Sequence, residues 1–222
     1  MKNVPGAFRI ITSLIAVLLG WFAIATIFAE ALTPRTGYFS QDSTRPDAPS
    51  SGWLAEWAAT VAPLRGDLLA NIAMARAAPA LATGKLGASP EIIAARERGL
   101  ALAKQSLSLA PHSSGIWLLT AMLQNQAQPR GSVAEFLKMS YLTSPADMQL
   151  IPTRLAVVSA SGAIADSDLK DLVRGDLRLI LTRRPDLKPA ITSAYQRGSA
   201  EGKVYISEVV RSLDPSFAAS LR

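Results

Sequence analysis

The sequence contains no cysteine and a single histidine, His112. The lack of cysteine excludes disulfide bonds, thiol nucleophiles, iron–sulfur clusters and zinc sites that use thiolate ligands. One imidazole also excludes a metal site built from several histidines. Charged residues are only 18% of the chain and hydrophobic residues are 49%, so the composition is too apolar for a disordered protein. We therefore expect a folded chain with no metal site and no cofactor.

Aromatic residues are also scarce, at 6% of the chain. The net charge is +6, and the basic residues are spread along the sequence instead of forming a stripe. A nucleic-acid-binding surface usually combines a basic stripe with aromatic residues, so we expect no nucleic-acid partner. A diffuse positive charge is compatible with a lipid surface or an acidic polymer as neighbour. The 222 residues suffice for one domain and an accessory segment.

Residues 10–29 form a run of twenty residues without a charged side chain. As a helix this run is about 30 Å long, which matches the hydrocarbon thickness of a bilayer. Lys2 and Arg9 precede the run and Glu30 follows it. Because positive charge favours the cytoplasmic side, the N-terminus is expected in the cytoplasm and the rest of the chain across the membrane. The expected division is a cytoplasmic tail at 1–9 and a transmembrane helix at 10–30.

A cleaved signal peptide is the alternative to this anchor. Ala29, Glu30 and Ala31 form a small-x-small cleavage pattern, with cleavage after Ala31. The apolar run is longer than the usual 7–15 residues of such peptides, so we favour the uncleaved anchor. Both alternatives place the main domain outside the cytoplasmic membrane, which for a bacterial chain is the periplasm.

Residues 31–52 are rich in proline, serine, threonine and glycine and read as a linker. From residue 53 to 222 the pattern is helical, with breakers about every 12–20 residues. Capping patterns predict helices over residues 90–109, 132–142 and 166–184. Residues 154–160 and 204–210 are β-branched enough for strands, but their neighbours are helical, so we expect helices there too. The predicted fold is all-α: one transmembrane helix, then antiparallel helical hairpins.

The segment 166–184 is the clearest amphipathic element. Its apolar side chains recur at intervals of three and four: Leu169, Leu172, Val173, Leu177 and Ile180. Aspartates crowd its first turns, where they suit the helix dipole better than a cation site. Its exposed basic side chains are the candidate contacts for an acidic partner: Arg174, Arg178, Arg183 and Arg184.

Helices in this domain end repeatedly at a proline, and 34 residues separate Pro111 from Pro145. An aromatic residue, Trp117, follows Pro111 by six positions, and a small residue, Ala121, follows by ten. The positions before the prolines that should be small are occupied by Gly99, Ser106 and Ser140. With this spacing the unit resembles a tetratricopeptide repeat, in which small residues let paired helices approach closely. The resemblance implies that Trp117 is a buried packing residue. Later units are degenerate, with Ile151 and Ile191 in place of the tryptophan.

The complete layout resembles bacterial single-pass proteins that carry a degenerate tetratricopeptide-like domain outside the membrane, some of which accompany envelope polysaccharide machinery. That resemblance implies a non-enzymatic scaffold that binds one or more membrane or periplasmic proteins, besides the bilayer itself. The alternative function is an accessory or hydrolytic enzyme that uses paired carboxylates such as Glu97 and Asp67. His112 is followed by Ser113 and Ser114, but no nucleophile-elbow motif surrounds them, so we expect a turn and no catalytic residue there.

Overall fold

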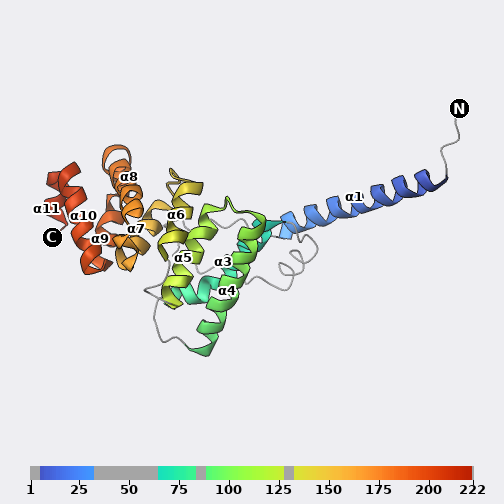
Figure 1. Cartoon of the computed structure of the whole chain (residues 1–222), viewed down its shortest axis with the longest axis horizontal. Helices are drawn as coiled ribbons and strands as arrows, with labels where there is room; N and C mark the ends of the chain where they lie inside the picture. The colour runs from blue at the N-terminus through green and yellow to red at the C-terminus, as the bar shows by residue number, and fades with distance from the viewer. Residues whose placement is uncertain (1–5, 33–64, 84–88, 128–132, 222) are drawn as a thin grey trace.

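The structure is a computed structural model that describes residues 6–32, 65–83, 89–127 and 133–221. All regular secondary structure in these ranges is helical, which confirms the all-α prediction. The helices are α1 (Gly6–Leu32), α3 (Gly66–Thr83), α4 (Pro90–Leu109), α5 (Ser114–Ala127), α6 (Val133–Thr143), α7 (Ile151–Ala160), α8 (Ser167–Arg183), α9 (Lys188–Arg197), α10 (Ala200–Leu213) and α11 (Pro215–Ser220), with short 3-10 helices η1 (Gly162–Ala165) and η2 (Pro185–Leu187). Helices α3 to α11 follow one another along the long axis of the molecule (Figure 1).

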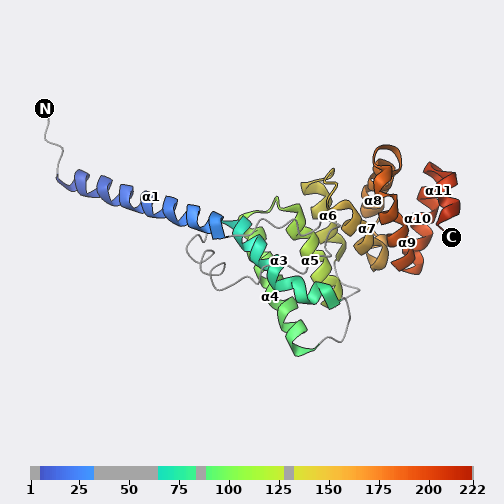
Figure 2. The ribbon, with the colours of Figure 1, turned by 180° about the vertical axis from the view of Figure 1, so that it is seen from behind.

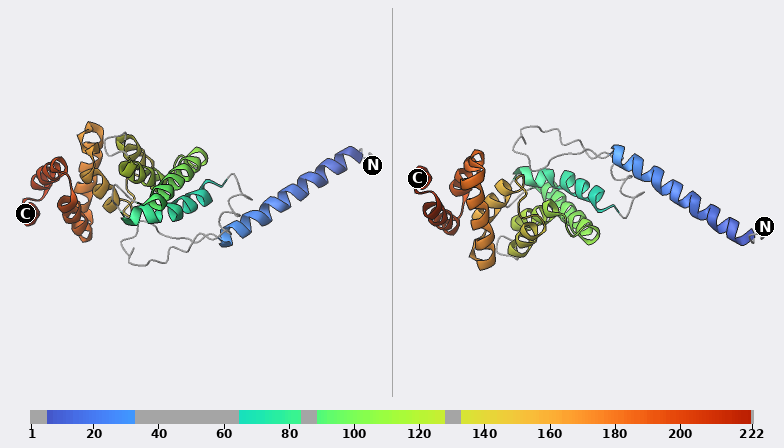
Figure 3. Two further views of the ribbon diagram at one scale, coloured as in Figure 1. Left: turned by 90° about the horizontal axis from the view of Figure 1, so that it is seen from below. Right: turned by 90° about the horizontal axis from the view of Figure 1, so that it is seen from above.

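Helix α1 projects away from the other helices in every view (Figures 1 and 3). Its segment Phe8–Ile27 has a mean hydropathy of 2.4, and its large apolar side chains are exposed. Large apolar side chains along it face outward, for example Val17 with 70% and Trp21 with 64% of its surface exposed. By length and composition this helix can span a membrane, and a signal sequence would have the same properties. The helix begins earlier and ends later than the predicted segment 10–30. The predicted linker, 31–52, falls almost wholly outside the described residues.

Helices α3 and α4 form an antiparallel pair held at close range by two glycines. A Cβ atom on Gly66 would lie 2.8 Å from Cβ of Ala110, and one on Gly99 would lie 2.9 Å from Cβ of Ala77. The first contact joins the start of α3 to the end of α4, and the second joins a later part of α3 to the middle of α4, so the two helices run antiparallel. The apolar faces of this pair, with part of α5, form the first of two core clusters.

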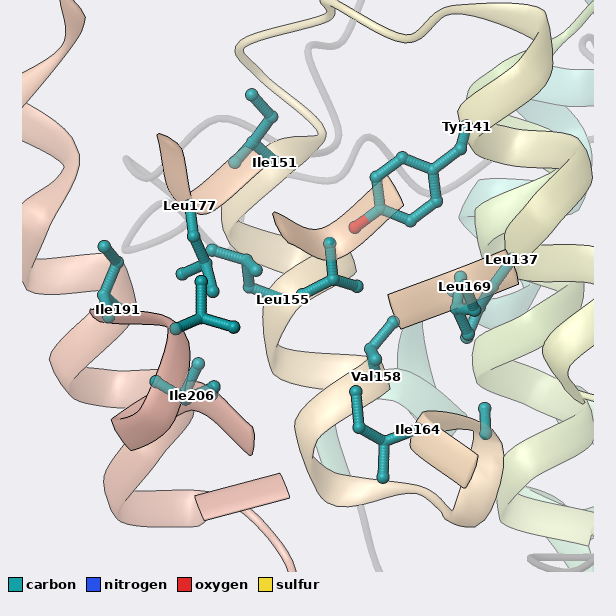
Figure 4. Packing of buried hydrophobic residues seen from close by; sticks show 14 of the residues in the cluster. Leu137, Tyr141, Ile151, Leu155, Val158, Ile164, Leu169, Leu177, Ile191 and Ile206 are labelled. Atoms are coloured by element: carbon teal, nitrogen blue, oxygen red, sulfur yellow. The ribbon is translucent and has the colours of Figure 1, made fainter. Parts of the chain in front are cut away.

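The second and larger core cluster extends from α5 to the end of the chain. Figure 4 shows its centre, where apolar side chains from α6, α7, α8, α9 and α10 meet. Helix α5 belongs to both clusters, because Leu119 faces the first and Leu118 the second, each with no exposed surface. The two clusters therefore share one helix, which joins the N-terminal and C-terminal parts of the domain.

The C-terminal helices include both segments that resembled strands. Residues 154–160 lie in α7 and residues 204–210 in α10, so the helical assignment of both is confirmed. Helix α10 passes close to the end of α7 at Gly202, where the backbone of Ser159 leaves no room for a side chain. Ser199 reinforces this contact, because its backbone N–H donates to the Ser159 carbonyl oxygen at 2.8 Å and its hydroxyl at 3.0 Å.

Replacing Gly202 with alanine should lower the free energy of unfolding by about 2–3 kcal/mol, because the added methyl would overlap the Ser159 carbonyl. The matched control is Gly175→Ala on the exposed face of α8, where no atom lies within 4 Å of the added Cβ. That change should stabilise the domain by about 0.5–1 kcal/mol through helix propensity. Urea unfolding of the full chain in detergent measures both values. Equal effects of the two substitutions would contradict the α7–α10 contact.

Candidate functional site

Two buried serines make equivalent contacts in successive hairpins. The Ser106 hydroxyl on α4 donates to the Gly66 carbonyl oxygen at the start of α3, at 2.8 Å. The Ser140 hydroxyl on α6 donates to the Ser114 carbonyl oxygen at the start of α5, at 2.9 Å. In both pairs the second helix is tied to the first turn of the helix before it. Of the other residues chosen for the repeat, Gly99 and Ala121 are buried.

Loss of the Ser106 hydroxyl should leave the buried Gly66 carbonyl oxygen without this partner. We expect Ser106→Ala to cost about 1–3 kcal/mol of unfolding free energy. Ser108→Ala is the control, because the Ser108 hydroxyl is exposed and donates only within its own helix, to Gln105. Its replacement should change stability by less than about 0.5 kcal/mol. Denaturant unfolding measures both effects. A small effect at both positions would show that the Ser106–Gly66 hydrogen bond does not stabilise the hairpin.

Trp117 was expected to be a buried packing residue, and it packs against the first core cluster but is only half-buried. Its ring stacks on Phe136 of α6, with centroids 6.2 Å apart. Its indole N–H donates to the Pro111 carbonyl oxygen at 2.7 Å, in the turn that precedes α5. An indole N–H needs a hydrogen-bond partner, and the partner here lies at the edge of the hairpin, which keeps part of the ring at the surface.

The most conspicuous buried polar group is Arg154 of α7, which has no exposed surface. Its Nε donates to the Ser140 hydroxyl at 3.1 Å, and its Nη2 donates to the Ser144 carbonyl oxygen at 3.0 Å and also to the Ser140 carbonyl oxygen. The guanidinium also lies over the ring of Tyr141, 4.6 Å from its centroid. Carbonyl groups at the end of a helix lack partners within it and attract positive charge. Arg154 therefore closes the C-terminal end of α6.

Asp176 of α8 and Tyr141 of α6 complete this buried cluster. Only 4% of Asp176 and 1% of Tyr141 are exposed. Three polar atoms of the cluster make no hydrogen bond of normal geometry among the described residues: Tyr141 Oη, Arg154 Nη1 and Asp176 Oδ2. The Tyr141 hydroxyl nevertheless lies close enough to the Asp176 carboxyl to affect its pKa. Figure 4 shows the Tyr141 hydroxyl pointing into the packed core. The burial leaves no access for a substrate, so we assign the cluster to the packing of α6, α7 and α8.

Burial raises the pKa of the Asp176 carboxyl to about 7, although Tyr141 and Arg154 oppose the shift. Burial is also the main reason that the pKa of the Tyr141 hydroxyl is raised, with the neighbouring Asp176 charge adding to the effect. Desolvation thus outweighs the attraction of the buried guanidinium at Asp176. At neutral pH a substantial share of the folded molecules carries Asp176 as the neutral acid.

The cluster predicts an unusual dependence of stability on pH. An aspartate has a pKa near 3.9 when unfolded, so between about pH 4 and 7 the folded state binds more protons at Asp176. The contribution of Asp176 to stability therefore falls as the pH rises through this window. Relative to wild type, Asp176→Asn should gain about 2 kcal/mol between pH 5.5 and 8, because it removes this titration.

The measurement is urea unfolding of the wild type and the variant at both pH values. Tyr141→Phe is the comparison, because it keeps the buried carboxyl and removes a hydroxyl that lowers the pKa of Asp176. This variant should retain the loss of stability with rising pH and displace it to higher pH. A constant difference between Asp176→Asn and wild type at the two pH values would rule out a raised pKa at Asp176.

The four arginines chosen as partner contacts differ in their surroundings. Arg174, Arg178 and Arg183 are exposed. Among the described residues none of these three forms an ion pair. Arg184 is half-buried, and its Nε and Nη2 donate to the Asp186 carboxylate at 2.9 and 2.6 Å. With Lys170, Arg174 and Arg178 are spaced four residues apart along α8, so the three form one row, called here the basic row.

Among the described residues, the two carboxylates chosen for the enzymatic alternative and His112 do not form one site. Asp67 pairs with Arg65 beside Gly66, whereas Glu97 lies near the opposite end of the hairpin, close to Gly99. The helical rise places the two residues roughly 15–18 Å apart along the α3 axis, so their carboxylates do not form a pair. Asp166 accepts from the backbone N–H of Leu169 and caps α8, as the sequence predicts. His112 lies exposed in the turn before α5. Within the described ranges no three metal-ligating side chains gather.

An open groove lies between α8 and α10 near the C-terminal end of the domain, where Figure 2 shows the two helices. Its volume is about 510 Å³. Ile164, Ala165, Ala200 and Val204 supply its apolar surface, and Val204 is 57% exposed. Lys170 lies on the α8 side, and the α10 side carries Glu201 and Glu208. The sequence analysis identified the arginines of α8 but missed α10 and its acidic wall.

Comparison with known proteins adds no relative. No protein-family model, no curated protein and no solved structure matches the chain. Assignment of function therefore depends on the helices and surfaces described above.

Proposed function

We propose that the chain is a membrane-anchored helical-repeat scaffold that presents a protein-binding surface outside the cytoplasmic membrane and has no catalytic role. The observation that carries the proposal is the contrast between its two parts. Helix α1 exposes apolar side chains along its length, whereas α3 to α11 bury theirs in two core clusters. Apolar exposure of this extent is favourable in lipid and costly in water.

Support for a binding role comes from α8. Its apolar face is buried, and its basic row faces outward with Arg174 and Arg178 free of ion pairs among the described residues. The Arg174 guanidinium interacts with the Tyr205 hydroxyl of α10, which leaves its charge without a counter-ion. Exposed charges that form no ion pair contribute little to folding and are available to a partner of opposite charge. The equivalent serine contacts in α3–α4 and α5–α6 support a repeat of hairpins, which resembles the tetratricopeptide arrangement.

The partner class follows from the location. A domain tethered next to the membrane meets membrane proteins and soluble proteins of the same compartment most often. In bacteria this compartment is the periplasm, with the N-terminus of the chain in the cytoplasm. The layout resembles proteins that accompany envelope polysaccharide synthesis or export, and we propose that process as the setting.

Reversal of Arg174 and Arg178 to glutamate should remove at least one envelope protein from the set that co-purifies with the full chain. We expect its recovery from detergent-solubilised membranes to fall at least tenfold, because a complementary charge contact becomes repulsive. Arg98→Glu with Lys104→Glu is the matched control, since both side chains are exposed on α4 and the charge change is equal. Quantitative mass spectrometry compares the three preparations.

An identical set of proteins in all three preparations would contradict a binding role for α8. His112→Ala tests the enzymatic alternative, and we expect it to complement a deletion strain fully. A folded His112→Ala protein that fails to complement would contradict the scaffold and require a catalytic role.

A further inference from the structure

We propose that the groove between α8 and α10 binds an amphipathic helix of a partner protein, with acidic residues along one edge and basic residues along the other. The inference rests on the proposed function and specifies the chemistry of the partner. Its starting point is the charge of the two walls, which are opposite in sign. Lys170, the first residue of the basic row, lines the groove on the α8 side, and Glu201 and Glu208 line it on the α10 side.

The charged walls do not neutralise each other. Among the described residues neither Lys170, Glu201 nor Glu208 forms an ion pair. The wall helices are instead joined below the rim, where the Tyr205 hydroxyl donates to the Lys170 carbonyl oxygen. That bond engages the Lys170 backbone and leaves its ammonium group available. Charges that face a groove without pairing across it can each bind a complementary charge on an occupant.

The apolar surface of the groove is shallow, so it suits contact with a single aliphatic side chain. Val204 exposes 57% of its surface there, flanked by Ala165 and Ala200. Glu201 and Glu208 are seven residues apart, so they lie on one face of α10 about 10 Å from each other, or two helical turns, with the apolar Val204 between them. If an aliphatic side chain of the partner helix packs on Val204, the partner residues on either side of it lie beside the charged walls.

A helix fits this groove better than an extended peptide or a lipid. The groove is lined by α10 on one side and by η1 and the start of α8 on the other, and all three are helices, so an extended peptide would find no strand edge to pair with. A helical occupant satisfies its own backbone and needs only side-chain contacts. An anionic lipid headgroup would meet the carboxylates of Glu201 and Glu208, which repel it.

The test uses two synthetic helical peptides of equal composition, measured against the purified full chain in detergent. Both have the same aliphatic face. The first carries lysines seven residues apart on one edge and glutamates on the other edge. The second alternates lysine and glutamate along each edge, so that each wall meets a like charge whichever way the helix lies. We expect the first peptide to bind at least tenfold more tightly.

Glu201→Lys with Glu208→Lys should abolish this preference, and both positions are exposed, so the fold should be retained. Val204→Asp should weaken binding of the first peptide at least tenfold, because it places a charge on the apolar contact. Circular dichroism checks that each variant is folded. Equal binding of the two peptides, or a preference that survives the double reversal, would overturn the proposal.

A photo-crosslinking amino acid at position 204 extends the test to cells. The proposal expects crosslinks to a partner segment with basic residues seven apart, which Glu201→Lys with Glu208→Lys removes. Crosslinks to lipid alone, or to a segment without that pattern, would contradict it. Loss of the peptide preference with continued co-purification through Arg174 and Arg178 would refute the groove and leave the scaffold standing.

Discussion

The packing of α6, α7 and α8 centres on one buried cation, Arg154 of α7, and the Lys138–Asp166 ion pair adds a second polar contact between α6 and the start of α8. The Arg154 guanidinium bonds to the Ser140 hydroxyl, which in turn donates to Ser114, so one chain of hydrogen bonds crosses from α7 through α6 to α5. The same group stacks on Tyr141 and lies near Asp176 of α8. A fully buried guanidinium is tolerated only where its neighbours are fixed, so this cluster determines where the C-terminal helices sit against the N-terminal hairpins.

Features with a short-range cause could be predicted from the sequence. The α8 stripe follows from its three-and-four spacing, and its N-terminus from Asp166, which caps it in the structure. The helical assignments of α7 and α10 were correct although both segments are rich in β-branched residues, because packing against neighbouring helices outweighs the β-propensity of those residues. Small residues at positions 99, 106 and 140 were chosen for close approach, and all three are buried.

Features that need the three-dimensional arrangement were missed or misjudged. A lone arginine in the apolar segment 151–160 and an aspartate between Val173 and Leu177 were both signals of buried charge, but neither shows which helices supply the partners. Trp117 was expected to be buried and is only half-buried, because the repeat pattern records spacing and not the position of the Pro111 carbonyl to which its indole donates. The groove is shared by α8 and α10, which are separated in sequence by α9, so no single segment reveals its opposite walls.

The claim that the helical domain lies outside the membrane while α1 holds it there is tested most directly by cysteine labelling, which the cysteine-free chain permits without background. Gln105→Cys places a thiol on the exposed face of α4, and Gly6→Cys places one at the start of α1. In intact cells a membrane-impermeant maleimide should label the cysteine at position 105 and reach the one at position 6 only after permeabilisation. Protection of position 105 in intact cells would contradict the exterior location, and absence of position 6 from the mature protein would show that the N-terminal segment is cleaved.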